Sequence, residues 1–215
     1  MALKDLQYYL TVIPAALIAI SFHEMSHAGA AYLLGDRTAK SEGRLSFNPI
    51  SHIDPLGLLC MIFFGFGWAK PVPVNPYYFK NRRLGMALTA AAGPLCNFVL
   101  GAVSVFIYVV IVFAQPGRLL LSLGQFFSVL GSLSIGLGFF NLLPVPPLDG
   151  SKVLFLFLPG RIINWFYRYD GYIRLALLLC LWFGLLDGII GAGQRFLLNG
   201  VINLAIRICV FVGLA

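Results

Sequence analysis

Apolar stretches of about 18 residues or more recur along this chain of 215 residues, and they constrain its fold more than any other feature. Hydrophobic residues make up 60% of the chain and charged residues only 11%. Water-soluble domains of this size do not have such a composition, whereas membrane proteins do. Because a backbone in lipid must satisfy its own hydrogen bonds, we expect an all-α polytopic membrane protein.

The spans can be placed from the apolar stretches and the turn residues between them. The first stretch follows no net positive charge, so we expect it to stay in the mature protein as a helix that ends at Gly35. Residues 56–69 are too few for a span and predict a re-entrant or interfacial segment. The alternating prolines of residues 70–76 predict extended backbone, either an edge strand or a turn. The predicted membrane helices are residues 8–34, 85–114, 119–143, 173–190 and 196–214.

The charge pattern indicates topology rather than a nucleic-acid partner. The formal net charge is +7, but Lys and Arg are scattered between the apolar stretches and form no basic stripe. Most of them fall in residues 35–83 and 150–174, which the positive-inside rule places on the cytoplasmic side. The four cysteines are widely spaced, so we expect neither a disulfide framework nor a cysteine zinc site.

The first apolar stretch contains the motif His23-Glu24-Met25-Ser26-His27. On a helix, His23 and His27 point to nearly the same side and can hold one zinc ion, with Glu24 placed to take a proton from a bound water. The alternative is a chance pentapeptide with two satisfied core histidines. Ionisable residues at membrane depth are costly and usually functional, which favours the metal site.

A catalytic zinc ion usually has three protein ligands, so a third is needed at the same depth. Asp149 follows a proline-broken stretch at the cytoplasmic end of the helix predicted over residues 119–143. Asp187 lies near the other side of the membrane, and Asp54 is in a loop, so Asp149 is the best-placed acid. We expect His52 to be a loop histidine that is bonded locally rather than a ligand.

The chain resembles the site-2 protease family of intramembrane zinc metalloproteases. The matching residues are His23 to His27, Gly93 to Asn97, and Asn141 to Gly150, in this order on three membrane segments. Asn48 to Gly57 and Lys70 to Asn75 also resemble the compact bacterial and archaeal members. The resemblance covers roughly residues 15–155.

The resemblance implies that His23, His27 and Asp149 bind one Zn²⁺ per chain and that Glu24 is the general base and later proton donor. It also implies that Asn97 helps to hold the substrate backbone or the developing oxyanion. In the family, a membrane-embedded hairpin between the first two core helices can pair with an unwound substrate, and residues 56–76 match it. The PDZ and CBS domains of larger members have no room here, so we expect a minimal form.

These observations together predict a single integral peptidase domain over residues 1–215, with a three-helix catalytic core at about 8–155 and additional C-terminal helices at about 172–215. The expected activity is hydrolysis of peptide bonds in or near transmembrane segments, and the expected lipid bilayer is a prokaryotic cytoplasmic membrane. The active site would face the cytoplasmic side. Two alternatives stay open: a transporter or ion pathway that uses the same cluster, and a proteolytically silent membrane binding protein.

Overall fold

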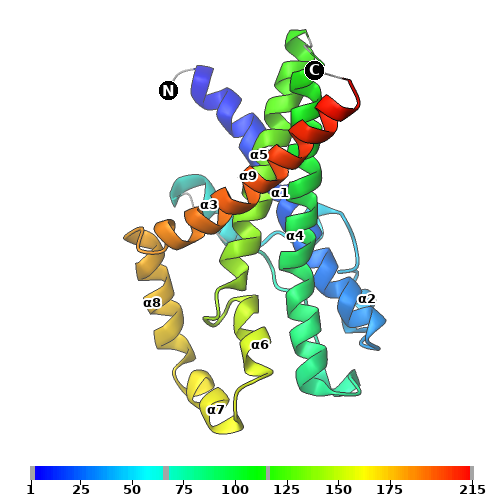
Figure 1. Ribbon diagram of the computed structural model, residues 1–215. Coiled ribbons are helices and arrows are strands. Elements are labelled where there is room, and N and C mark those ends of the chain that lie inside the picture. The colour runs from blue at the N-terminus through cyan, green and yellow to red at the C-terminus, as the bar shows by residue number, and fades with distance from the viewer. Residues whose placement is uncertain (1–2, 65–67, 115–116, 214–215) are drawn as a thin grey trace. The chain divides into compact units, whose positions relative to one another are not determined.

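The computed structural model describes residues 3–64, 68–114 and 117–213, and these residues form helices joined by turns and loops (Figure 1). No β-strand occurs in these three ranges, so the all-α prediction is confirmed. Two short 3-10 turns, Pro49–Ser51 and Pro76–Tyr78, lie between the helices. The helices are α1 (Leu3–Leu33), α2 (Thr38–Ser41), α3 (Pro55–Phe64), α4 (Arg82–Phe113), α5 (Arg118–Leu142), α6 (Asp149–Phe155), α7 (Gly160–Arg168), α8 (Asp170–Trp182) and α9 (Asp187–Phe211).

Four helices of the described chain are long and apolar enough to cross a membrane. These candidate spans are Tyr8–Leu33, Arg82–Phe113, Leu119–Leu142 and Asp187–Phe211. The first three agree with the predicted spans to within a few residues, because each ends at turn residues that the sequence shows. Gly35, for example, terminates the first span with a φ of 106°, a conformation that glycine adopts without strain.

The prediction of two closing helices at residues 173–190 and 196–214 is wrong in its boundary. The structure has a short α8 and a long α9, and α9 continues through residues 191–195, where a break was expected. With 13 residues, α8 is only about 20 Å long and does not reach across a bilayer core.

The chain breaks instead between α8 and α9, at Gly184. Gly184 has a φ of 67°, and the following Leu185 N–H donates to the Cys180 carbonyl at 2.9 Å. This is the left-handed cap with which many helices end. The sequence offers several glycines in this region, and only the fold shows which of them ends the helix.

The predicted re-entrant or hairpin segment contains the ten-residue helix α3 and a single antiparallel bridge between Ile53 and Ala69. The expected hairpin turn falls partly on residues 65–67, which lie outside the described residues. A β-carbon on Gly57 would lie 2.1 Å from the Trp68 carbonyl oxygen. Glycine is therefore needed at this position for the two ends of the segment to approach each other.

The chain divides into two compact units. The first contains residues 1–19, 97–140 and 180–215, and the second contains residues 20–96 and 141–179. In the first unit, α4 and α5 approach closely at Gly101 and Gly131, where an added β-carbon would lie 2.5 Å from Ile135 or 2.6 Å from Val105. Small residues at such a contact are typical of membrane helix packing, because they allow the backbones to approach.

In the second unit, Arg44 is 5% exposed and holds together two segments that are distant in sequence. Its Nη1 donates to the Ser51 carbonyl, and its Nη2 donates to the carbonyls of Lys70 and Pro71, the latter at 3.0 Å. A buried guanidinium needs such acceptors, because an unsatisfied buried charge is very costly. Arg44 therefore fixes the start of the extended segment that follows Lys70.

The other end of that extended segment is fixed by Asp36, which has no exposed surface. One carboxylate oxygen accepts from the Asn75 N–H at 2.6 Å, and the other accepts from the Thr38 N–H at 2.9 Å and the Thr38 hydroxyl at 2.5 Å. The Thr38 contacts hold the first turn of α2. Residues 70–75 are thus held at both ends by buried charged side chains. They form neither helix nor strand, and Asn75 has the predicted extended backbone.

We predict that Arg44→Met lowers the free energy of unfolding by about 2–4 kcal/mol, because three carbonyl groups lose a charged donor. Chemical denaturation in detergent measures the change. The matched control is Arg37→Met, which removes an exposed arginine seven positions earlier and is expected to stay within about 0.5 kcal/mol of the wild type. Equal stability of the two variants would contradict the proposed role of Arg44.

Candidate metal centre

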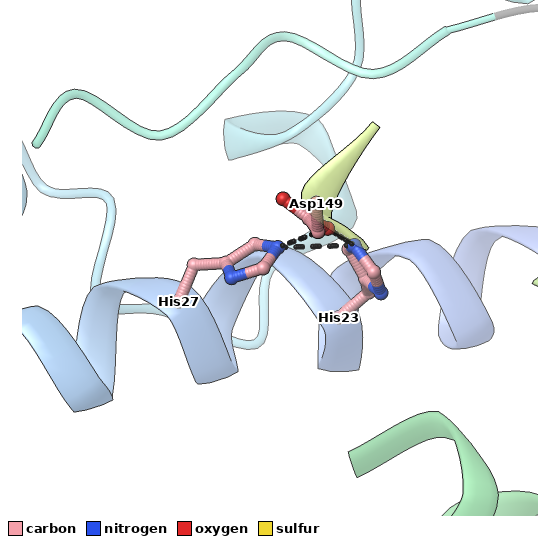
Figure 2. Close-up of side chains that lie close together, drawn as sticks. All are labelled: His23, His27 and Asp149. Atoms are coloured by element: carbon pink, nitrogen blue, oxygen red, sulfur yellow. Dashed lines mark hydrogen bonds and ion pairs between the residues drawn. The ribbon is translucent and has the colours of Figure 1, made fainter. Parts of the chain in front are cut away.

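Helix α1 brings His23 and His27 together on one side. The two residues are one helical turn apart, and they are 5% and 7% exposed. Their rings meet edge to face with centroids 4.6 Å apart, and the two Nε2 atoms lie 3.0 Å from each other (Figure 2). The prediction that the motif places both imidazoles on the same side of a helix is confirmed.

Asp149, the first residue of α6, completes a group of three (Figure 2). Its Oδ2 atom lies 3.1 Å from the His23 Nε2 and 3.0 Å from the His27 Nε2, and the residue is 7% exposed. The chain reaches this position by a tight return after α5. A β-carbon on Gly150 would lie 2.1 Å from the Leu142 carbonyl oxygen, so glycine is required directly after Asp149.

The hydrogen bond on the far side of His27 determines which ring nitrogen faces the group. His27 Nδ1 lies 2.7 Å from the Thr89 carbonyl, which can only accept, so Nδ1 carries the hydrogen. In a neutral ring, Nε2 then presents its lone pair to His23 and Asp149. Most metal-binding histidines are oriented in this way, by a hydrogen bond from the ring nitrogen that does not face the metal.

The three converging atoms attract a cation. Burial of the Asp149 carboxyl disfavours its ionised form, but its close contacts with the His23 and His27 rings outweigh this penalty and hold the pKa of Asp149 below its usual range. Two ring nitrogens and a carboxylate oxygen meet at one point, so a proton or a metal ion must lie among them for the contacts to be favourable. Histidine and carboxylate ligands suit zinc.

The dimensions of the group fit a zinc ion. A tetrahedral zinc with bonds of about 2.0–2.1 Å holds its ligand atoms about 3.3 Å apart. The three distances here are 3.0, 3.0 and 3.1 Å, so each needs to lengthen by only about 0.3 Å. Three protein ligands also leave one position for water, as in catalytic zinc sites.

Gly93 on α4 provides the open space beside the rings. A β-carbon at this position would lie 2.5 Å from the His27 Nε2 and 2.7 Å from the His23 Cε1. Any larger residue would therefore push the imidazoles out of place. The sequence showed Gly93 only as part of a family motif, and its contact with the histidines comes from the tertiary structure.

Lys152 interacts with the second oxygen of the Asp149 carboxylate. Its Nζ lies 3.4 Å from Oδ1, while Oδ2 faces the two histidines. The ammonium group thus neutralises the oxygen that points away from the cluster. Because Oδ1 contacts Lys152, Oδ2 is the one oxygen of Asp149 that faces the two histidines and is available to a metal ion.

The other residues singled out in the sequence lie outside this group of three. Glu24 follows His23 on α1 and is half-buried, and Asn97 is fully buried on α4 within the other compact unit. The His52 Nε2 donates to the Ser46 carbonyl at 2.7 Å, so the expectation of a locally bonded histidine is confirmed. Sequence reasoning missed Arg44 and Asp36, which looked like ordinary charges of a polar loop.

We predict that Gly93→Ala lowers the metal affinity by roughly 10- to 100-fold, because the added methyl group displaces the histidine rings. Metal content after dialysis against a graded chelator measures this change. Gly29→Ala is the matched control, since a β-carbon there would meet only Leu45, at 3.9 Å. A Gly93→Ala protein with wild-type metal retention would show that the rings do not hold the metal.

Comparisons with known proteins agree with this chemistry. The family model of peptidase family M50 matches residues 110–181. A protein of Bacillus subtilis (strain 168), provisionally named zinc metalloprotease YwhC, is 41% identical over 159 residues, which are 70% of this chain and 72% of the relative. No solved structure matches the chain at a significant level.

More distant relatives carry the same kind of name. A provisionally named zinc metalloprotease, MJ0611, of Methanocaldococcus jannaschii is 33% identical over 68% of this chain and 72% of its own length. The Rip2 protein of Mycolicibacterium smegmatis, named in the same way, is 30% identical, and the matched region spans just over half of it, 56%. The chain therefore belongs to peptidase family M50, the site-2 protease family, and is a zinc metalloprotease of the membrane.

Proposed function

We propose that this metalloprotease is an intramembrane endopeptidase, which hydrolyses peptide bonds in or near the transmembrane segments of other proteins. One observation carries the proposal: His23 and His27 belong to a helix that is long and apolar enough to span a membrane, and both are buried against Asp149. A peptidase that acted on soluble substrates would not need its ligands in such a helix. We further propose that residues 1–215 act as one peptidase domain.

His23, His27 and Asp149 are the proposed ligands of one zinc ion per chain. When bound, zinc acts as a Lewis acid that makes water more acidic and polarises a carbonyl group. The Thr89 carbonyl keeps the His27 ring in the tautomer that can ligate, and Gly93 leaves the space that both rings occupy. These contacts support the assignment of the ligands.

Glu24 is the proposed general base. Its carboxylate would accept a proton from the attacking water and later deliver that proton to the leaving amine. Asn97 is the proposed donor to the substrate backbone or the developing oxyanion. The resemblance of Gly93 to Asn97 to the family motif supports this role, and Asn97 is fully buried on α4.

The extended segment from Lys70 to Asn75 is the proposed docking edge for the substrate. A helical substrate must unwind before cleavage, and its freed backbone groups then need partners. In extended backbone, Val72 and Val74 direct their N–H and C=O groups to one edge, while Pro71 and Pro73 lie on the other. In the described chain, the backbone groups of the two valines make no hydrogen bond, so they could pair with a substrate strand.

The proposed location is a prokaryotic cytoplasmic membrane with the active site toward the cytoplasm. The excess of Lys and Arg in residues 35–83 and 150–174 supports this orientation. The named relatives come from bacteria and an archaeon, which supports a prokaryotic membrane. The proposed partners are the bilayer and a transmembrane protein or peptide substrate.

The test compares zinc content and cleavage in the wild type, Asp149→Ala and Glu24→Gln. We expect Asp149→Ala to lose zinc, and Glu24→Gln to keep it while cleavage falls roughly 10²- to 10⁴-fold. The proteins are reconstituted with the membrane proteins of a host strain, and new termini are mapped by mass spectrometry. Glu42→Gln, which changes an exposed acid, is the control and should cleave like the wild type.

Each other outcome identifies a different error. Folded wild type without zinc would favour a transporter or ion pathway, and zinc unaffected by Asp149→Ala would require a different third ligand. Zinc binding without any cleavage would favour a silent binding protein. Cleavage restricted to soluble segments would overturn the intramembrane proposal and keep the metalloprotease.

A further inference from the structure

Helix α7 (Gly160–Arg168) presents three different faces. Ile163 and Phe166 are half-buried, and Phe166 packs against Phe155 of α6 with ring centroids 5.4 Å apart. These positions recur at helical spacing and form the inner face. The inner face satisfies the packing of the helix, so the other two faces are available for contacts outside the chain.

The second face of α7 is apolar and aromatic, yet it is exposed. Ile162 is 42% exposed, Trp165 is 53% exposed and Tyr169, just beyond the helix, is 38% exposed. The positions are three and four residues apart, so they form one stripe. The Trp165 and Tyr169 rings lie against each other, with centroids 5.2 Å apart. Tryptophan and tyrosine side chains are typical of a membrane–water interface, where the polar atom of the ring contacts water and the rest of the ring contacts apolar groups.

The third face, beside the aromatic stripe, is basic. It consists of Arg161, Asn164 and Arg168, which are all exposed. Among the described residues, neither Arg161 nor Arg168 has an ion-pair partner, whereas Arg174 is paired with Asp170 at 2.7 Å. Two unpaired cations next to an exposed apolar stripe are the pattern of a helix that lies in the plane of the interface.

A contact with α4 supports this depth. Arg83 donates from Nη1 to the Leu158 carbonyl, in the turn directly before α7, at 3.2 Å. Arg83 belongs to the first turn of α4, at the polar end of the candidate span Arg82–Phe113. The start of α7 therefore lies level with the end of a membrane span. With nine residues, α7 is only about 14 Å long and cannot itself cross a bilayer.

We propose that α7 lies in the membrane surface, with Trp165 and its stripe among the acyl chains next to the headgroups, and that Arg161 and Arg168 bind anionic lipid headgroups. The apolar stripe supplies burial, and the two arginines supply charge complementarity to the anionic leaflet. The proposal does not depend on zinc or on proteolysis. The lipid surface is then the partner of the segment between α6 and α8.

The test measures the fluorescence of Trp165 in the full chain with Trp68→Phe and Trp182→Phe, reconstituted in phosphatidylcholine vesicles. We expect lipid brominated near the headgroup to quench more strongly than lipid brominated deep in the chains. Strong quenching by aqueous iodide without quenching by either lipid would show that α7 faces water. Protection from iodide and from both lipids would show that a second protein copy covers the stripe. Either result overturns the proposal.

The role of the arginines is tested with brominated phosphatidylglycerol mixed into phosphatidylcholine. We expect each arginine to enrich the anionic lipid around Trp165 by roughly fivefold, which is measured as stronger quenching by the brominated phosphatidylglycerol. This enrichment should be lost in the Arg161→Gln/Arg168→Gln double variant and in high salt. Arg174→Gln is the matched control, since that arginine already has a partner, and it should keep the preference. Equal quenching by the two lipids in the wild type would overturn the headgroup assignment.

Discussion

The rest of the site depends on three atoms that converge on one point, out of water, and that could hold a metal ion: the Nε2 atoms of His23 and His27 and the Oδ2 atom of Asp149. His23, His27 and Asp149 are costly to bury separately, because each loses its hydration, and their lone pairs repel unless a cation lies among them. The surrounding chain is arranged around that requirement. Gly93 leaves room for the rings, and Gly150 lets the chain return closely enough to bring Asp149 to them.

A second buried charge system shapes the polar part of the same compact unit. Arg44 and Asp36 satisfy backbone groups at the two ends of residues 70–75, a segment whose prolines prevent regular secondary structure from doing so. Beyond Lys70, whose N–H donates to the His52 carbonyl, the backbone between them is therefore held by side chains rather than by a neighbouring strand. An edge that is held in this way keeps backbone groups available, which is what binding of an extended peptide requires.

The sequence and the structure agree where local rules apply. The length of each apolar stretch predicts the first three spans, and the four-residue spacing of His23 and His27 places both rings on one side of α1. The proximity of Asp149 to the two histidines could be predicted because few acids lie at the same end of a predicted span. The boundary between α8 and α9 could not, because several glycines there could end a helix and packing selects Gly184.

The sequence by itself determined that this is a helical membrane protein with a zinc-binding motif in its first span, since composition and helical periodicity are local properties. Only the tertiary structure decided that Gly93 borders the two rings, that the Thr89 carbonyl sets the tautomer of His27, and that Arg44 holds residues 70 and 71. These contacts join segments that are 26 to 70 residues apart. Sequence spacing carries no information about such distances, because they are fixed when the helices pack and their buried polar groups find partners.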